Sequence, residues 1–309
     1  MPDRLLVIAG PTGVGKTATA VALARRLPIE VVSADSRQVY RGMDVATGKP
    51  TPEERRAVPH HLVDIVDPAE RYHAARFAAD ARAATEAIRA RGRLPVVVGG
   101  TGLYIRALLR GLDPGVPADP ELRRELAGIA AREGRAALHA RLEREAPAVA
   151  RRLHPNDQVR VVRALERLRG GGATATEQVR WRTAGHGGND VLYVGLTLER
   201  ARLATRLRAR ARAMVEAGLL AEVKGLLARG YDESLTAMQG IGYREFARVA
   251  RGQLLAAEAL RLMERDTLRY AKRQWTWFTR EPAIHWIDLE AVGGPAGAAA
   301  EVERMIADR

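Results

Sequence analysis

A glycine-rich run near the N-terminus is the first part of the sequence that could do chemistry: Gly10-Pro11-Thr12-Gly13-Val14-Gly15-Lys16-Thr17. It matches the full pattern G-x-x-x-x-G-K-[ST], with a strand-like run before it and a helical pattern after it. The glycines let backbone N–H groups converge on phosphate oxygens, and the helix N-terminus adds its dipole. Lys16 supplies a mobile positive charge, and the Thr17 hydroxyl suits a Mg²⁺ ligand. The loop predicts a phosphate site without naming the substrate.

A second feature separates this loop from most ATP and GTP sites. Those proteins usually carry an acidic residue at the end of a later strand, where it organises Mg²⁺. Here the strand-like run 96–98 ends in Gly99-Gly100-Thr101-Gly102, and the best placed carboxylate is Asp35, at the end of another strand. The small, neutral Thr101 would lie close to a phosphate oxygen or a transferred group. The sequence therefore predicts a phosphate site that lacks the acidic strand-end residue usual in NTPases.

Strand and helix patterns alternate around these residues. Apolar runs predict strands, and 3.6-residue periodicity predicts helices between them. Strands separated by helices imply parallel pairing, so we expect an α/β fold with a P-loop NTPase-like three-layer core and a mainly parallel sheet. The predicted strands are 5–9, 30–34, 94–98, 191–196 and 284–287, and the predicted helices include 17–27, 73–91 and 199–214.

Two clusters of chain-breaking residues, at 111–120 and 170–188, enclose a stretch with only helical patterns. We therefore predict an all-helical insertion domain at residues 113–187, within a discontinuous core formed by 1–112 and 188–309. The segment 121–185 holds 14 Arg against 8 Asp or Glu, a net charge of +6.

The whole chain of 309 residues has a net charge of +13, which favours a polyanionic partner such as nucleic acid. A general bias toward arginine is the alternative explanation. No run approaches the roughly 20 apolar residues of a membrane span, and the N-terminus does not resemble a signal peptide. We expect a soluble, cytoplasmic monomer with no membrane contact. Cysteine is absent, which excludes disulfides and thiolate sites. The adjacent His60 and His61 are expected to have structural roles.

Six ordered blocks resemble the tRNA dimethylallyltransferases, also called tRNA isopentenyltransferases, across nearly the whole chain. The bacterial type is indicated, since the zinc-finger tail of some eukaryotic relatives is missing. The blocks are the loop 10–17, Ser33 to Asp44, Pro59 to Pro68, Val98 to Tyr104, His154 to Glu166, and Gly240 to Glu245 with Ala271 to Trp277. Two departures leave the roles of Arg37 and Lys49 open. The family often has Met at position 37, and it has Gly-Thr-Ala-Lys-Pro where this chain has Ala46-Thr47-Gly48-Lys49-Pro50.

The resemblance implies transfer of a dimethylallyl group from dimethylallyl diphosphate to the exocyclic amine of the adenosine 3′ of the anticodon. The tRNAs would be those reading codons that begin with uridine, and diphosphate would be released. Asp35 is similar to the family's general base, with a Mg²⁺ ligand or helix cap as the alternative role. The leaving group would be stabilised by Lys16, the loop 10–17, Thr101, Mg²⁺ on Thr17, and Arg210. Without the resemblance, the arginine-rich helix 199–214 would instead favour a position for Arg210 on a solvated helix face.

The anticodon stem-loop is the implied macromolecular partner, with the target base extruded into a pocket. Arg261, Arg265, Arg269 and Arg273 recur every four residues and form one helical stripe. Beside it, Lys272, Trp275 and Trp277 give the basic and aromatic mixture that suits unpaired RNA, although a core role for either tryptophan is an equal alternative. The residues expected to contact tRNA are Asp35, Ser36, Arg37, Gln38, Thr101, Arg123, Val159, Arg160, Val161, Val162, Arg163, Gly240, Ile241, Gly242, Tyr243, Arg244, Glu245, Lys272, Arg273, Gln274, Trp275 and Trp277.

Two other functions fit parts of the sequence. A small-molecule P-loop kinase fits the loop but not the basic insertion or the Gly99-Gly100-Thr101 strand end. An NTP-switched RNA-binding protein fits the loop and the charge. ATP turnover would favour either of these two, whereas turnover of dimethylallyl diphosphate without ATP would favour the transferase.

Overall fold

The computed structural model describes residues 4–111, 119–170 and 191–308. The chain divides into two compact units, a large unit of Met1–Leu109 with Gly185–Arg309 and a small unit of Arg110–Ala184. The predicted boundaries of the insertion, at residues 113 and 187, lie outside the described residues. Within the described ranges, no helix is long and apolar enough to cross a membrane.

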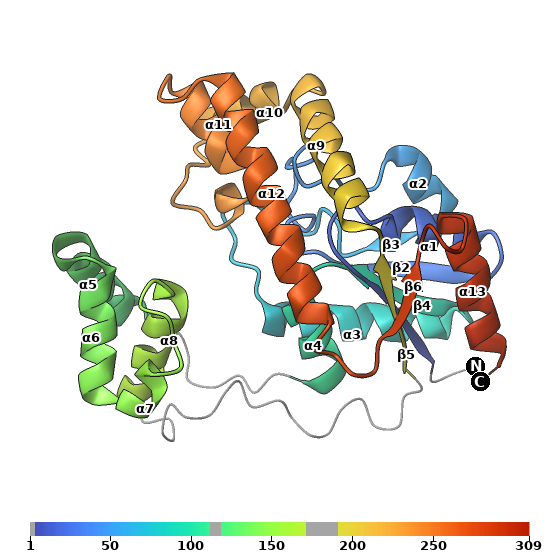
Figure 1. The fold of residues 1–309 in the computed structure, drawn as a ribbon, viewed down its shortest axis with the longest axis horizontal. Helices are drawn as coiled ribbons and strands as arrows, with labels where there is room; N and C mark the ends of the chain where they lie inside the picture. The colour runs from blue at the N-terminus through green and yellow to red at the C-terminus, as the bar shows by residue number, and fades with distance from the viewer. Residues whose placement is uncertain (1–3, 112–118, 171–190, 309) are drawn as a thin grey trace. The chain divides into compact units, whose positions relative to one another are not determined.

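A six-stranded sheet forms the centre of the large unit (Figure 1). Its order is β3-β2-β4-β1-β5-β6, and every pairing between these strands is parallel. The central strands are continuous apolar runs, as expected of strands that are covered on both faces. The bounds are β1 Leu5–Ala9, β2 Ile29–Ala34, β3 His60–His61, β4 Leu94–Gly99, β5 Val191–Thr197 and β6 His285–Asp288.

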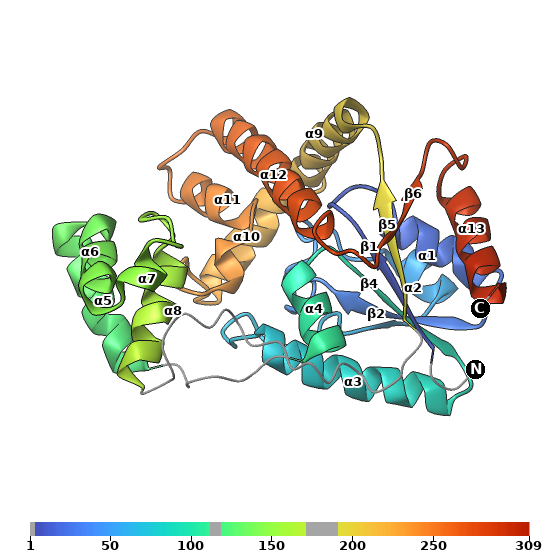
Figure 2. The same ribbon diagram turned by 60° about the horizontal axis from the view of Figure 1, so that its bottom comes forward.

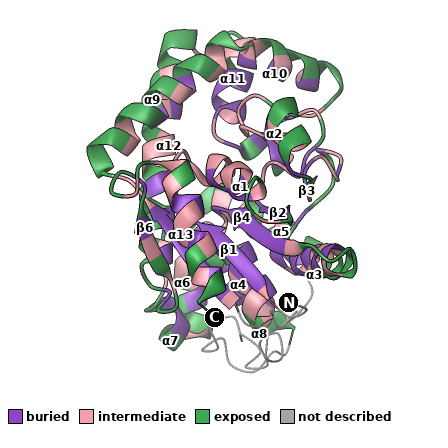
Figure 3. Cartoon of the chain, turned by 90° about the vertical axis from the view of Figure 1, so that its right-hand side faces the viewer, coloured by how far each residue is buried: buried purple, intermediate pink, exposed green. Residues whose placement is uncertain are grey.

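Helices cover both faces of the sheet (Figures 1 and 2). On one face, α1 (Lys16–Ala24) and α13 (Pro295–Ala307) pack on a core that includes Leu6, Ile8 and Val98. On the other face lie α3 (Ala74–Ala90) and α4 (Gly102–Arg110), whose rings Phe77 and Tyr104 stack with centroids 4.6 Å apart. The strands are therefore buried between two helical layers, as the burial colouring shows (Figure 3).

A group of helices follows β5 in the chain. Helix α9 packs on α12, α12 on α11, and α11 on α10 (Figure 1). The short α2 and the 3₁₀ turn η1 lie in the connections. The bounds are α2 Pro52–Ala57, α9 Arg200–Glu216, α10 Leu219–Ala228, η1 Ala237–Gln239, α11 Tyr243–Ala250 and α12 Ala256–Phe278.

The described residues of the small unit form helices around an apolar core of their own. Leu122, Leu126, Leu138, Leu142 and Val161 are among its fully buried side chains. The predicted all-helical character is therefore confirmed for residues 119–170. The helices are α5 Pro120–Glu133, α6 Arg135–Glu145, α7 Pro147–Ala150 and α8 Gln158–Arg169.

The predicted fold class is confirmed, and so are the five predicted strands, whose ends differ from the prediction by at most one residue. Strand β3, which consists of only His60 and His61, was not predicted from the sequence. A two-residue edge strand has no apolar run or alternation to reveal it, because its pairing is set by the neighbouring strand.

Candidate functional site

The site begins where three neighbouring strands end. In register, Ala9 of β1 and Ala34 of β2 both lie beside Gly99 of β4. Since the strands are parallel, the loops that start at Gly10, Asp35 and Gly100 leave the same edge of the sheet. Only glycine fits at position 99, because a Cβ there would lie 2.2 Å from the carbonyl oxygen of Ala34. The carboxyl ends of parallel strands are the usual place for a ligand.

The phosphate loop is shaped by its glycines and ends in a helix. Gly10, Gly13 and Gly15 all have positive φ, at 146°, 75° and 120°. At Gly10 a Cβ would also lie 2.7 Å from the carbonyl oxygen of Leu196. Helix α1 begins at Lys16, so the loop amides and the helix N-terminus face one cavity. Backbone N–H groups that converge at a helix N-terminus are suited to bind an anion.

Lys16 folds back over this loop. Its Nζ donates to the carbonyl oxygens of Gly10 at 3.0 Å and Pro11 at 2.8 Å. Burial lowers the pKa of Lys16 to about 8; Asp35 opposes this effect and Arg210 adds to it. The three charged groups therefore affect one another electrostatically, as expected if they share one site.

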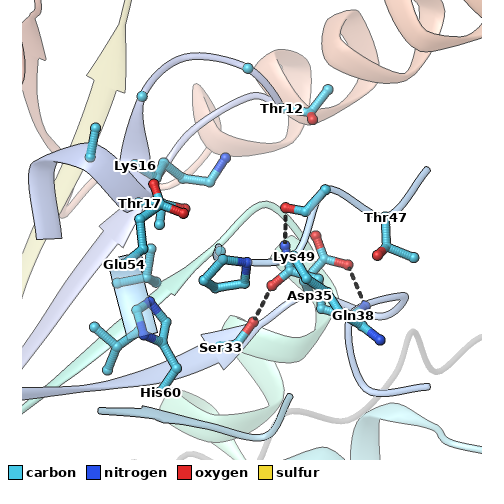
Figure 4. A pocket seen from close by; sticks show the side chains of 18 of the residues that line it. Thr12, Lys16, Thr17, Ser33, Asp35, Gln38, Thr47, Lys49, Glu54 and His60 are labelled. Atoms are coloured by element: carbon cyan, nitrogen blue, oxygen red, sulfur yellow. Dashed lines mark hydrogen bonds between the residues drawn. The ribbon is translucent and has the colours of Figure 1, made fainter. Parts of the chain in front are cut away.

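Asp35 anchors the turn that follows β2. Its Oδ1 accepts hydrogen bonds from the backbone N–H of Arg37 at 2.8 Å and of Gln38 at 3.3 Å. The turn is also tied to the next loop, because the Ser36 N–H donates to Thr101 Oγ1 over 3.1 Å. Asp35 thus caps a turn and not a helix, while its side chain also lines the cavity (Figure 4).

Arg37 and Lys49, two residues at which the sequence differs from the family pattern, hold the surrounding loops in place. Arg37 NH1 donates to the carbonyl oxygen of Thr236 at 2.5 Å, next to η1. Lys49 is almost inaccessible to solvent and pairs with Asp44 and Asp64. Gln38 accepts from Ser33 Oγ at 3.0 Å and donates to the carbonyl oxygen of Gly48 at 3.1 Å. These contacts stabilise the walls of the cavity.

Arg210 reaches the site from α9. Its NH1 lies 3.4 Å from Thr12 Oγ1, and burial lowers its pKa. A Cβ at Gly48 would lie 1.7 Å from Arg210 NH2, so the glycine at this departure from the family pattern leaves room for the guanidinium. Arg210 is thus a cavity residue and not part of a solvated helix face.

The site consists of two cavities that share several lining residues. The first, of about 350 Å³, is polar and is the one drawn in Figure 4. The second, of about 320 Å³, has an apolar wall from α9 and α12 that includes Leu207, Met214 and Met263. Thr12, Asp35, Thr47 and Arg210 line both. The site therefore has a polar half next to the loop 10–17 and a more apolar half, and Asp35 lines both.

Several lining residues were not predicted. Glu54 and His60 line the first cavity, and Tyr270 lines the second. Burial raises the pKa of Tyr270 to about 12, and the nearby Thr101 side chain opposes this effect. The four-residue spacing between Tyr270 and Gln274 is a helical signal that could have placed both on one face of α12. No comparable signal marked Glu54 or His60.

The turn 240–245 packs against the second cavity. The backbone N–H of Gly242 donates to Glu245 Oε2 at 2.7 Å, and this bond caps the N-terminus of α11. The buried Tyr243 donates to Glu222 Oε1 at 2.6 Å, and Arg244 pairs with Asp266. Gly240, Ile241, Tyr243 and Arg244 all line the cavity, so the structure brings this block to the site.

The arginine stripe of α12 is largely exposed. Arg261 and Arg269 have side-chain exposures of 68% and 63%, whereas Arg273 lines the second cavity. Trp275 is partly exposed and lies against Trp286, with ring centroids 4.8 Å apart. Lys272 is exposed as well.

The last tryptophan of the motif lies between helices. The guanidinium carbon of Arg106 stands 4.3 Å from the ring centroid of Trp277. A Cβ at Gly102 would lie 2.1 Å from Trp277 Nε1, so the indole packs directly on the start of α4. This position matches the alternative core role for Trp277.

In the small unit, the residues expected to contact tRNA have different surroundings. Arg123 and Arg163 both hydrogen-bond the fully buried Glu166. Burial raises the pKa of Glu166, but these arginines outweigh that effect and hold the pKa below its usual value. Val161 packs in the core and Val162 beside it.

Two of the expected small-unit contacts are on the surface. The exposed fraction is 81% for Val159 and 69% for the Arg160 side chain, which lies 3.5 Å from Asp157.

The adjacent histidines contact their surroundings differently. His61 Nε2 lies 2.6 Å from Glu30 Oε2, and His60 Nδ1 lies 2.8 Å from the carbonyl oxygen of Val58. Both residues pair with β2 through their backbones. These contacts agree with the structural roles expected for them.

Comparison with known proteins identifies the family. Residues 38–281 match the sequence profile of IPP transferase, and residues 3–63 match that of isopentenyl transferase. The chain belongs to the IPP transferase family. A similar relative is the tRNA dimethylallyltransferase of Anaeromyxobacter dehalogenans, 52% identical over 92% of this chain and 94% of that protein. Another, from Desulforudis audaxviator, is 46% identical over 98% of this chain and 97% of that protein.

Solved IPP transferase structures have the same fold. The tRNA isopentenylpyrophosphate transferase from Bacillus halodurans is 39% identical, with a TM-score of 0.68 over 98% of this chain and 99% of that one. A eukaryotic dimethylallyltransferase acting on tRNA is 29% identical, with a TM-score of 0.77 over 99% of this chain and 80% of that one. The family indicated by the six sequence blocks is therefore confirmed.

Proposed function

We propose that this IPP transferase family member transfers the dimethylallyl group of dimethylallyl diphosphate to the exocyclic amine of an adenosine. The adenosine is the one 3′ of the anticodon in tRNAs reading codons that begin with uridine. One observation carries the proposal: Asp35 lines both a polar cavity beside the loop 10–17 and a more apolar cavity. A transferase needs this arrangement, because its base must face the bond between donor and acceptor. The tRNA activities named for the relatives agree with it.

In this reaction the amine nitrogen attacks the carbon that carries the diphosphate. A C–N bond forms, the C–O bond breaks, and the electron pair of that bond leaves with the diphosphate. Asp35 accepts the proton that the nitrogen loses, which offsets the poor nucleophilicity of a conjugated amine. Met214, Met263 and Leu207 offer an apolar wall for the hydrocarbon group. Such a wall also limits competition by water at the reacting carbon.

The leaving diphosphate gains negative charge, so pre-placed cationic and hydrogen-bonding groups lower the barrier. Lys16 and the loop amides lie on one side of the first cavity, and Arg210 enters from α9. Thr101 is held beside the turn of Asp35 by the Ser36 N–H. In this proposal Lys16 and Arg210 bind the diphosphate, and Thr101 donates to an oxygen at the breaking bond.

Mg²⁺ fits the oxygen donors of this cavity. Thr17, in the first turn of α1, lines it together with the Glu54 carboxylate, and hard oxygen donors suit this cation. Thr17 would hold the ion, which supplies charge neutralisation for the diphosphate when bound. The chain's own cationic groups remain the donors assigned above.

The tRNA is proposed to contact the exposed arginines of α12 and the basic small unit. The chain carries +13, of which +6 lies in residues 121–185, and phosphate contacts of this kind position an RNA. We further propose that the protein acts as a monomer in the cytoplasm.

The test is incubation with labelled dimethylallyl diphosphate and an unmodified tRNA, without ATP. Transfer of label to the adenosine 3′ of the anticodon, and release of one diphosphate, are expected. A tRNA with guanosine at that position is the matched control and should stay unlabelled. ATP hydrolysis without transfer of label would contradict the proposal.

A further inference from the structure

The inner face of α12 lies against the two loops that hold the proposed leaving-group donors. Tyr270 lies close enough to Thr101 for that side chain to lower its pKa, and Gln274, one turn later, hydrogen-bonds the adjacent Gly100. A spacing of four residues puts both side chains on the same helical face. The largely exposed Arg269 belongs to a different face. Helix α12 therefore combines a basic outer face with an inner face that contacts the loops.

Gln274 uses both ends of its amide in these contacts. Its Oε1 accepts from the backbone N–H of Thr12 over 2.8 Å, and its Nε2 donates to the carbonyl oxygen of Gly100 over 2.8 Å. The residue is only 6% exposed. The loop residue is fitted to it, because a Cβ at Gly100 would lie 2.2 Å from Gln274 Nε2. One buried side chain thus links the start of the phosphate loop to the loop of Thr101.

Only an amide of this length can make both bonds. The Thr12 N–H needs an acceptor, whereas the Gly100 carbonyl needs a donor. A carboxylate in place of the amide keeps the first contact but puts a negative charge against the carbonyl oxygen. A thioether of similar shape keeps neither bond, which leaves two backbone groups without their partner. The two substitutions therefore separate shape from hydrogen bonding.

We propose that Gln274 is a positioning residue that fixes the phosphate loop and the Thr101 loop relative to each other. With this separation fixed, Lys16 on one loop and Thr101 on the other can act on the same leaving group. Catalysis of this kind depends on placement to well below 1 Å, so a small shift of either loop is costly. The inference rests on the proposed function and deepens it. A positioning role for Gln274 also differs from the tRNA contact predicted for this residue from the sequence.

Two variants and a control on the same helix test this inference. Gln274→Glu and Gln274→Met are compared with Thr276→Ala, whose exposed side chain bonds only the carbonyl oxygen of Lys272 within α12 among the described contacts. We expect both Gln274 variants to lower kcat by about 10- to 100-fold and to weaken binding of inorganic pyrophosphate. The KM for tRNA should stay within about twofold, because the amide faces the loops and not the outer face. Thr276→Ala should match the wild type.

The pH dependence supplies a readout that a general loss of stability would not change. Once protonated, the carboxyl group introduced by Gln274→Glu can donate to the Gly100 carbonyl oxygen. The activity of Gln274→Glu relative to Gln274→Met should therefore rise as the pH falls. A ratio that stays constant with pH would contradict the positioning role.

A raised KM for tRNA with unchanged pyrophosphate binding would mean that Gln274 contacts RNA, and would overturn the inference. If Gln274→Met does not fold, the nearly isosteric Gln274→Glu decides the question alone. The pyrophosphate titration is independent of prenyl transfer. Failure of the wild type to use dimethylallyl diphosphate would reject the proposed function, while normal pyrophosphate binding by both Gln274 variants would reject the positioning role.

Discussion

The backbone N–H of Ser36 donates a hydrogen bond to Thr101 Oγ1 over 3.1 Å. This bond joins the residue after Asp35 to the loop after β4. It forms because Ala34 and Gly99 are neighbours in register at the ends of β2 and β4. The proposed base and the proposed donor to the leaving group are therefore placed by the same pair of strands.

Asp35→Asn should strongly reduce transfer while leaving the turn intact. The amide oxygen can still accept from the backbone N–H of Arg37 and Gln38, so the local fold has its partners. A general base typically accelerates a reaction by roughly 10²- to 10⁴-fold, so we expect kcat to fall by at least about 10²-fold. Affinity for tRNA should stay within about tenfold. Single-turnover assays and filter binding measure the two quantities; near-normal kcat would exclude Asp35 as the base.

Thr101→Val should lower kcat much more than it raises either KM. Valine keeps the shape of threonine but cannot accept from the Ser36 N–H or donate to a leaving oxygen. Loss of one such donor typically reduces kcat by about 10²- to 10³-fold. Thr101→Ser retains the hydroxyl and should recover most of the activity. Equal defects in the two variants would point to packing of the methyl group instead.

The strands that place these residues could be predicted because each is a buried apolar run next to a helical pattern. The phosphate loop was predicted for a similar reason, since its glycines and Lys16 serve one local conformation. By contrast, β3 depends on pairing of His60 and His61 with a neighbouring strand. A contact made between distant parts of the chain leaves no local pattern.

Side-chain partners were harder to predict than elements. The family resemblance placed Arg123 and Arg163 on the RNA surface, yet both bond the buried Glu166. Gln274 lies in a basic motif but points at two loops more than 170 residues away in the chain. Helical periodicity can identify the inner face of α12. It cannot identify which loop packs there.

Binding of inorganic pyrophosphate should weaken as the pH rises through about 8. Burial lowers the pKa of Lys16 to about 8, so the group loses its charge above that pH unless an anion holds the proton. Calorimetric titrations between pH 6.5 and about 9.5 should show the loss in the wild type. Lys16→Met should bind weakly at every pH, and any pH dependence left in it belongs to pyrophosphate itself. Identical pH dependence in both proteins would contradict a charge role for Lys16.

The same pKa shift predicts an effect on stability with a definite sign. Because the folded pKa of Lys16 lies below its ordinary value of 10.5, the unfolded chain binds more protons between about pH 8 and 10.5. The contribution of Lys16 therefore makes the folded state more stable as the pH rises through this window. Comparison of the free energy of unfolding of the wild type and Lys16→Met measures it.

Arg210→Ala should raise the Kd for pyrophosphate by about tenfold or more, the effect of removing one charge-assisted contact. Arg208→Ala is the matched control, because Arg208 is exposed on the same helix. It should leave pyrophosphate binding unchanged. Equal effects of the two substitutions would mean that α9 acts through its total charge, and not through the position of Arg210 in the cavity.

On the proposed RNA surfaces, the structure separates residues that the sequence grouped together. Arg160→Ala and Arg273→Ala should raise the KM for tRNA and make its binding less dependent on salt. Each lost phosphate contact should reduce the slope of log K against log salt by roughly 0.7 to 0.9. Arg160 is largely exposed and Arg273 lines the second cavity, so both can reach RNA without supporting a core.

Arg163→Ala should act differently, because it removes one of the two arginines that bond Glu166. We expect the small unit to lose roughly 1–3 kcal/mol of stability, the usual cost of weakening the pairing of a buried polar group. Thermal unfolding distinguishes this effect from a loss of RNA contacts, and pyrophosphate binding should be unaffected in all three variants. If none of them changes the salt slope, the tRNA must bind a different surface. If Arg163→Ala changes the slope but not the unfolding temperature, its bond to Glu166 contributes little to folding.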